Sequence, residues 1–120
     1  MAHTFPAHMN ATEKTICNRL FKAVLAEAGN LHMRIHDGEE WATEWTRDLA
    51  KVRPEIHATD ATRVYIMAVS PDGAAARMGS ILLIHGNEDD LVSDASWNSR
   101  QPDAEALIDR LCNAASGLQW

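Results

Sequence analysis

The chain has 120 residues, a length that fits one domain and that can bury a core without a metal or disulfides. Hydrophobic residues make up 46% and charged residues 23% of it, as in a folded globular domain and unlike a disordered chain. The net charge of −6 argues against direct binding to nucleic acid or to an anionic membrane, because both need clustered cations. No apolar run approaches the ~20 residues of a membrane span, and the N-terminus does not resemble an export signal, so the cytoplasm is the expected compartment.

Residues 1–9 show no periodicity and are expected to form a flexible arm outside the domain. The first helix is predicted over Asn10–Ala28, because Asn10 is a favourable N-cap and Glu13 follows at the spacing of a capping box. Apolar residues then recur with the period of a helix that covers a core on one side. Gly29 supplies the conformation that ends such a helix.

The stretch Leu31–Trp45 is predicted to form a β-hairpin whose register follows from burial. If the loop has three residues, from His36 to Gly38, Met33 pairs with Trp41 and one face of the hairpin becomes apolar. Trp41 and Trp45 are then core residues. A two-residue turn would bring charged side chains onto that face, so the three-residue loop is preferred.

The next segment is ambiguous. Leu49, Val52 and Ile56 have helical spacing, but Pro54 removes a backbone donor and disfavours the helical conformation before it. We expect a short helix over Arg47–Val52 that is followed by an irregular turn, and a loop throughout is the alternative.

Three further strands are predicted, over Arg63–Val69, Arg77–His85 and Leu91–Ser96. Ser70–Gly73 is a strong turn signal between the first two, and the second is apolar on both faces, as a central strand should be. A C-terminal helix follows Pro102. The predicted order is α-β-β-(α)-β-β-β-α.

Short connections favour antiparallel neighbours. The predicted fold is therefore an α+β domain over residues 10–117, in which a five-stranded antiparallel sheet carries the N- and C-terminal helices on one face. Residues 118–120 are expected to form a tail.

The sequence holds no pattern typical of a catalytic, cofactor or metal site, such as G-x-S-x-G, H-E-x-x-H or C-x-x-C. No catalytic residue, cofactor or metal is therefore expected. His32 and His36 would be ~13 Å apart along a strand at about 3.3 Å per residue, too far to share an ion. The alternative is a ligand-binding domain or enzyme whose site lies between helix and sheet and includes His32, His57 or His85.

The candidate residues for binding a partner surround the last predicted hairpin: Asn87, Glu88, Asp89, Asp90, Asp94 and Trp97. The carboxylates do not follow the spacing of a calcium loop. They form either a solvated turn or a surface that a basic partner recognises. A tryptophan in polar surroundings is typical of an exposed anchor for a partner.

Three segments carry a resemblance to known proteins: HDGEEWA (36–42), TDATRVYI (59–66) and LLIHGNEDDLVSDAS (82–96). They resemble small uncharacterised acidic proteins of bacterial phages, prophages and plasmids, over about residues 30–96. The resemblance implies a mobile-element context, in which small acidic proteins often bind and block a host protein. Anti-CRISPR proteins are one such class, although no motif here identifies one.

The expected function is that of a small non-catalytic accessory or inhibitor protein that binds a protein partner. A basic, nucleic-acid-binding host protein is the first candidate for that partner, with no direct contact to nucleic acid or membrane. A homodimer that pairs through a sheet edge or the bare sheet face is a further alternative.

Overall fold

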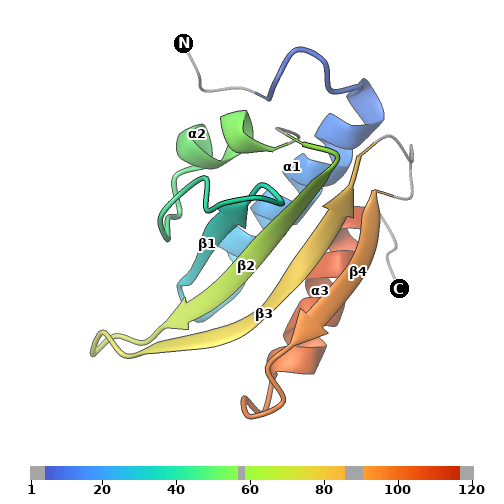
Figure 1. Ribbon diagram of the computed structural model, residues 1–120. Coiled ribbons are helices and arrows are strands. Elements are labelled where there is room, and N and C mark those ends of the chain that lie inside the picture. Colours follow the sequence, from blue (N-terminus) through green and yellow to red (C-terminus); the bar gives the residue numbers. More distant parts are fainter. Residues whose placement is uncertain (1–4, 57–58, 86–90, 117–120) are drawn as a thin grey trace.

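A computed structural model describes residues 5–56, 59–85 and 91–116. Its elements are α1 (Ala11–Ala26), β1 (Leu31–His36), α2 (Leu49–Val52), η1 (Arg53–Glu55), β2 (Ala61–Val69), β3 (Ala75–Ile84), β4 (Val92–Trp97) and α3 (Ala104–Ser116). The strands form one antiparallel sheet in the order β1-β2-β3-β4, and α1 and α3 pack against each other on one of its faces (Figure 1). The fold is a two-layer α+β domain. No helix in these ranges is long and apolar enough to cross a membrane.

Helix α1 begins where the sequence predicts. The Asn10 side chain accepts a hydrogen bond of 2.8 Å from the Glu13 amide, which satisfies one of the free donors of the first turn. The helix ends at Ala26, before the predicted Ala28, because Glu27 already has an extended backbone. Gly29 then has a φ of +103°, a conformation that glycine adopts at little cost.

Part of the segment 1–9 is packed against the domain rather than separate from it. Phe5 and Met9 are buried, and the Phe5 ring stacks on Phe21 of α1 with a centroid distance of 6.1 Å. The ordered domain therefore begins before Asn10, and two apolar side chains extend its core beyond the helix.

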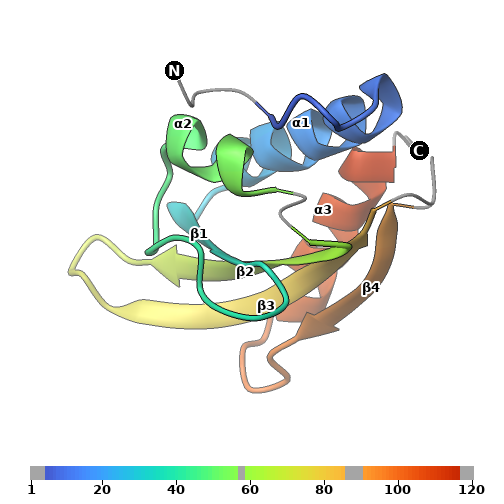
Figure 2. The ribbon, with the colours of Figure 1, turned by 45° about the horizontal axis from the view of Figure 1, so that its top comes forward.

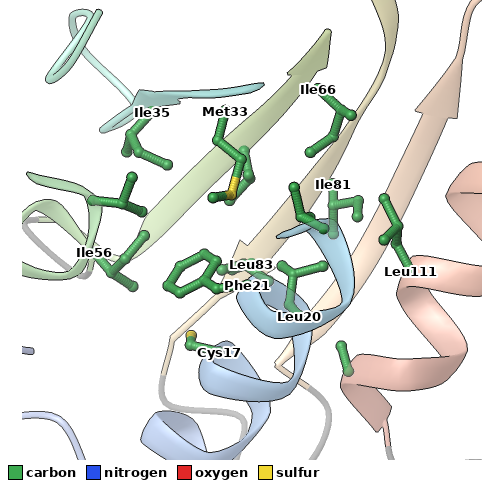
Figure 3. Close-up of a cluster of buried hydrophobic side chains, with 14 of the residues drawn as sticks. Cys17, Leu20, Phe21, Met33, Ile35, Ile56, Ile66, Ile81, Leu83 and Leu111 are labelled. Carbon is green, nitrogen blue, oxygen red and sulfur yellow. The ribbon is translucent and has the colours of Figure 1, made fainter. Parts of the chain in front are cut away.

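The core lies between the helices and one face of the sheet (Figure 3). It is built from the apolar stripes of α1 and α3 and from alternate residues of β1, β2 and β3. Its largest fully buried side chains are Leu20, Phe21, Leu31, Met33, Ile35, Ile56, Ile66, Ile81, Leu83, Leu91, Ile108 and Leu111. The alternation that burial requires thus fixes which face of each strand meets the helices.

The prediction of five strands is wrong: the sheet has four. The missing strand is the second arm of the predicted hairpin, which contacts β1 only through two isolated bridges, Met33 with Thr46 and His36 with Trp41. The predicted pairing of Met33 with Trp41 is therefore wrong as well. The segment after β1 forms no continuous strand, and in Figure 2 its loop passes in front of β2 and β3.

Polar side chains explain why the hairpin does not form. The Asp37 carboxylate accepts hydrogen bonds of 2.8 Å from the amides of Glu39 and Glu40, which makes the loop longer than the predicted one. The Thr43 hydroxyl then bonds the Ile35 amide, and the Arg34 guanidinium bonds the Thr43 carbonyl. Side chains thereby replace the backbone ladder that a strand would need.

Trp41 and Trp45 are not core residues, contrary to the prediction. Trp41 is 43% exposed and Trp45 is half-buried, because the segment that carries them does not share the face of Met33. Val52 and Ile56 occupy the core next to β1 instead, delivered by α2 and the 3₁₀ turn η1. The ambiguous segment is thus a short helix, capped by the Asp48 side chain.

Gly79 marks the closest approach within the sheet and to α3. A β-carbon at this position would lie 2.2 Å from the Ser96 carbonyl oxygen and 3.0 Å from Ile108 of α3. Only glycine fits here without a shift of the backbone. β3 also carries irregular pairing on both sides of this point, between Ile66 and Met67 and between Leu82 and Leu83.

Candidate functional site

The sheet face that faces away from α1 and α3 is called the open face below. The strand registers place one row of side chains across it, from Arg34 through Tyr65 and Ser80 to Ser96. None of these four residues is apolar, whereas the opposite face of the same strands is almost entirely so. This row therefore gives the open face polar and aromatic groups, of which Ser96 is exposed, Arg34 and Tyr65 are half-buried and Ser80 is buried.

A groove of about 280 Å³ opens on this face at the end of β4, and Trp97 contributes to its lining. Trp97 pairs with Gly79 and so alternates in face with Ser96, which places it at the border of the groove rather than in the open-face row. The groove is called the open-face groove, and the residues that matter for its chemistry are Trp45, Tyr65, Arg77, Ser80, Ser96 and Trp97. Trp97 is 44% exposed, although it is one of the largest apolar side chains in the molecule. Indole and phenol rings offer large contact areas with a polar group at one end, which is the composition of a binding surface.

A second aromatic group borders the groove through Tyr65. The rings of Trp41 and Tyr65 have a centroid distance of 4.8 Å, and His36 lies edge-on to Trp41 at 5.1 Å. The Arg34 guanidinium stacks over the Trp41 ring at 4.2 Å and also pairs with Glu44 at 3.3 Å. These contacts hold the loop that carries Trp41 and Trp45 against the open face.

Arg77, which lines the groove, and Arg63, which bonds the lining residue Ser80, differ from Arg34 in their partners. Arg63 donates a hydrogen bond of 3.1 Å to the Ser80 hydroxyl, a neutral acceptor. Arg77 is exposed, and its backbone carbonyl accepts from the Asn98 side chain. Among the described ion pairs none involves Arg63 or Arg77. The groove therefore has positive charge that no described carboxylate neutralises.

A different polar group lies on the helix side and is called the buried polar cluster: Glu13, Thr62 and His85. His85 Nδ1 is 2.9 Å from the Glu13 carboxylate, and Nε2 is 2.8 Å from the Thr62 hydroxyl. Because a carboxylate only accepts, Nδ1 carries the proton, and in a neutral ring Nε2 accepts from the hydroxyl. The cluster ties α1 to β2 and to the end of β3.

This order of groups is that of a nucleophile, a base and an orienting acid. Access decides against that role, because Thr62 is fully buried and the His85 side chain has no exposed surface. None of the hollows described on the surface is lined by a member of the cluster. A substrate cannot reach the hydroxyl in this arrangement, so the cluster acts as a structural connection between layers.

The histidines proposed as an alternative site are separated. His32 lies on the open face, where Nδ1 bonds the Asn30 carbonyl at 3.0 Å, whereas His85 lies on the helix side. His57 lies outside the described residues. Within the described ranges, no group of three or more histidine, cysteine or acidic side chains is arranged to hold a metal ion.

Both cysteines are free thiols. Burial raises the pKa of the Cys17 thiol to about 12, with a further contribution from the negative charge of Glu13. Burial also raises the pKa of Cys112, which is half-buried. A raised pKa suppresses the thiolate, so neither side chain is an activated nucleophile.

The largest described hollow, of about 650 Å³, lies between the α1–β1 turn and the β2–β3 hairpin. Its lining among the described residues is mostly small and apolar, with Asn30 and Ser70 as polar members, and carries no titratable side chain. Binding sites usually combine an apolar surface with a few polar groups that orient the ligand. The open-face groove adds a charged side chain, Arg77, and aromatic rings to this combination, and the hollow has neither among its described lining residues.

The predicted partner-binding residues lie partly inside and partly outside the described residues. Asn87, Glu88, Asp89 and Asp90 lie outside the described residues. Asp94 and Trp97 are exposed on β4, where Asp94 pairs with Leu82 and Trp97 with Gly79. Trp97 is exposed and lines a groove, and its role as an anchor stays a prediction.

The remaining groove residues were not singled out by their sequence. Tyr65, Ser80 and Ser96 look like ordinary strand residues, and the signal that could have found them is alternation. Two helices cover one face of a sheet, so the alternate positions of its strands must form an uncovered face. Glu13 was interpreted only as part of a helix cap, because its contact with His85 joins positions far apart in the chain.

Comparison with protein-family models, with curated proteins and with solved structures found no match.

Proposed function

We propose that this protein is a small non-catalytic binding protein that contacts a protein partner through its open face. The single observation that supports this proposal is the open-face groove, where Trp97 is left 44% exposed beside Tyr65 and Trp45. Exposed tryptophan in a shaped, partly polar surface is the composition of an interface hot spot. The blocking of a host nucleic-acid-handling or defence system remains a prediction, which rests on the acidity and size of the chain, the lack of catalytic motifs in its sequence and the resemblance.

Burial supports the non-catalytic part of the proposal. The one arrangement that has the order of a catalytic relay is enclosed in the core, and the groove lacks a paired nucleophile and base among its described residues. Binding therefore fits the accessible chemistry better than catalysis does.

The test is site-specific photo-cross-linking in lysate of cells that express the protein. A benzophenone side chain is introduced at Ser96, which lines the groove, and in a matched variant at Lys22, which is exposed on α1 in the opposite layer. A defined protein adduct from position 96, absent from position 22 and lost in Trp97→Ala, supports the proposal. An adduct from position 22 alone, or the same adducts from both positions, contradicts it.

A further inference from the structure

We infer that the open-face groove recognises an acidic segment of the partner, with a carboxylate at Arg77 and an aromatic or apolar side chain against Trp97. This inference rests on the proposed function and adds the chemistry of the partner. The positive charge of Arg77 in the groove is opposite in sign to the net charge of the whole chain, which is −6.

The charges around the groove favour an anion. Arg34 already has a carboxylate partner, Glu44, whereas Arg63 bonds a hydroxyl and Arg77 has no described ion pair. Asp94 is a further acidic residue on the same face, and its carboxylate accepts a hydrogen bond of 2.8 Å from the Ala95 amide. Guanidinium groups bind carboxylates through two parallel hydrogen bonds, so a carboxylate on the partner supplies the missing counter-charge.

The rings of the groove favour an apolar or aromatic neighbour of that carboxylate. Trp45, Tyr65 and Trp97 all line the groove, and its volume of about 280 Å³ suits a side chain or two rather than a large ligand. Burying the exposed part of Trp97 would remove apolar surface from water, at about 25 cal/mol per Å². The exposed hydroxyl of Ser96 is available as a polar contact beside the rings.

The edge of β4 argues against a partner that adds a strand. The Asn98 amide donates to the Met78 carbonyl at 2.9 Å, so amides at alternate positions also point toward β3, and the Ala95 amide points outward. The Asp94 carboxylate already occupies that outward amide. A segment that docks here is therefore recognised by side chains on the open face rather than by the strand edge.

Single-stranded nucleic acid also stacks on aromatic rings, but the observations favour a peptide. Nucleic-acid binding needs several cations to replace the counterions of the phosphates. The described lining of the groove offers one arginine, Arg77, within a protein of net charge −6, and Arg63 beside it is already bonded to Ser80. One or two carboxylates match this supply of charge better than a phosphate chain does.

The experiment is selection of random peptides displayed on phage, with the intact protein as bait in parallel with three variants. Arg77→Glu reverses the charge in the groove, and Lys22→Glu changes the net charge equally on an exposed position of α1. Trp97→Ala removes the ring. Circular dichroism confirms that each variant is folded before selection.

We expect the wild type and Lys22→Glu to select peptides that combine Asp or Glu with an aromatic residue. Arg77→Glu should bind the selected peptides at least about tenfold more weakly and select basic peptides instead. Trp97→Ala should lose roughly 30-fold in affinity, as expected at a hot spot.

Selection that depends on Trp97 but shows no acidic preference, or no response to Arg77→Glu, overturns the inference and leaves the proposed function standing. Failure to select any peptide that depends on Trp97 counts against both. Binding of a short oligothymidylate, or a dimer in light scattering that is abolished by Trp97→Ala, would assign the groove to nucleic acid or to a second copy and overturn the inference.

Discussion

The two faces of the sheet hold their polar side chains in opposite ways. On the helix side, Glu13, Thr62 and His85 bond one another away from water. On the open face, Tyr65 and Arg77 line a groove that solvent can enter. The buried polar cluster has the better hydrogen-bond geometry, but the open-face groove is the one that a ligand can reach. A chain of well-placed polar groups is therefore not a functional site unless a ligand can reach it.

The largest loss of stability should come from a substitution that removes a member of the buried polar cluster. Glu13→Ala removes a buried acceptor from His85, and we expect it to lower the free energy of unfolding by about 3 kcal/mol. The matched control is Glu27→Ala, at the C-cap directly after the same helix, whose pair with Arg110 is solvent-exposed and should contribute less than about 1 kcal/mol. Urea denaturation measures both. Equal losses in the two variants would mean that the cluster is not a structural connection.

A smaller loss of stability should come from a side chain added at Gly79, where the backbone lies close to β4 and α3. Gly79→Ala places a methyl group against the Ser96 carbonyl and Ile108, and we expect a loss of about 1–3 kcal/mol because the strands or α3 must shift. Peptide binding in the groove should also weaken, since Gly79 lines it. Thermal unfolding together with peptide binding measures both effects. A variant of unchanged stability would show that α3 is not held this closely.

The helix side should also be closed to reagents. With a pKa of about 12 and no exposed surface, Cys17 should be alkylated by iodoacetamide at pH 8 at least about 100-fold more slowly than in the unfolded chain. Cys112, which is half-buried, should react first. Mass spectrometry after short exposure separates the two sites. Rapid modification of Cys17 would show that the helix side opens readily.

The smallest effect should appear at acid pH, in the loop that places Trp41 and Trp45 on the open face. Hydrogen bonds from the amides of Glu40 and Glu39 lower the pKa of Asp37 in the folded protein. Its stabilising contribution is therefore complete above the unfolded-state pKa, at about 4, and is lost as the pH falls through the lower folded-state pKa.

Asp37→Asn keeps the accepting oxygen but cannot ionise. Its urea midpoint should be close to that of the wild type at pH 3 and slightly below it at pH 7. A difference that is larger at pH 3 than at pH 7 would have the wrong sign for this contribution.

Patterns of short range predicted much of the fold. The cap at Asn10, the period of α1 and α3 and the turn after Val69 each depend on neighbouring residues, and each element was found where expected. The error arose where local patterning competes with particular side-chain bonds. Burial alone favoured a hairpin after Gly38, but the Asp37 and Thr43 side chains satisfy the backbone instead, which removes the fifth strand.

The candidate site was less predictable because it is assembled across strands. Trp97 could be chosen from its polar surroundings, but its neighbours in the groove come from the loop after β1 and from β2 and β3. Their meeting depends on the register and on the course of the loop that carries Trp45. The buried polar cluster depends in the same way on a contact between Glu13 and His85, which no local pattern encodes.

Nuclear magnetic resonance can test most directly that the open face, and not the buried polar cluster, is the binding surface. A peptide from the selection is titrated into labelled protein, and amide and indole shifts are followed. We predict that the largest changes fall on Trp45, Tyr65, Ser80, Ser96 and Trp97, with Glu13, Thr62 and His85 unaffected. Changes centred on Glu13, Thr62 and His85, with the groove residues unmoved, would contradict the account.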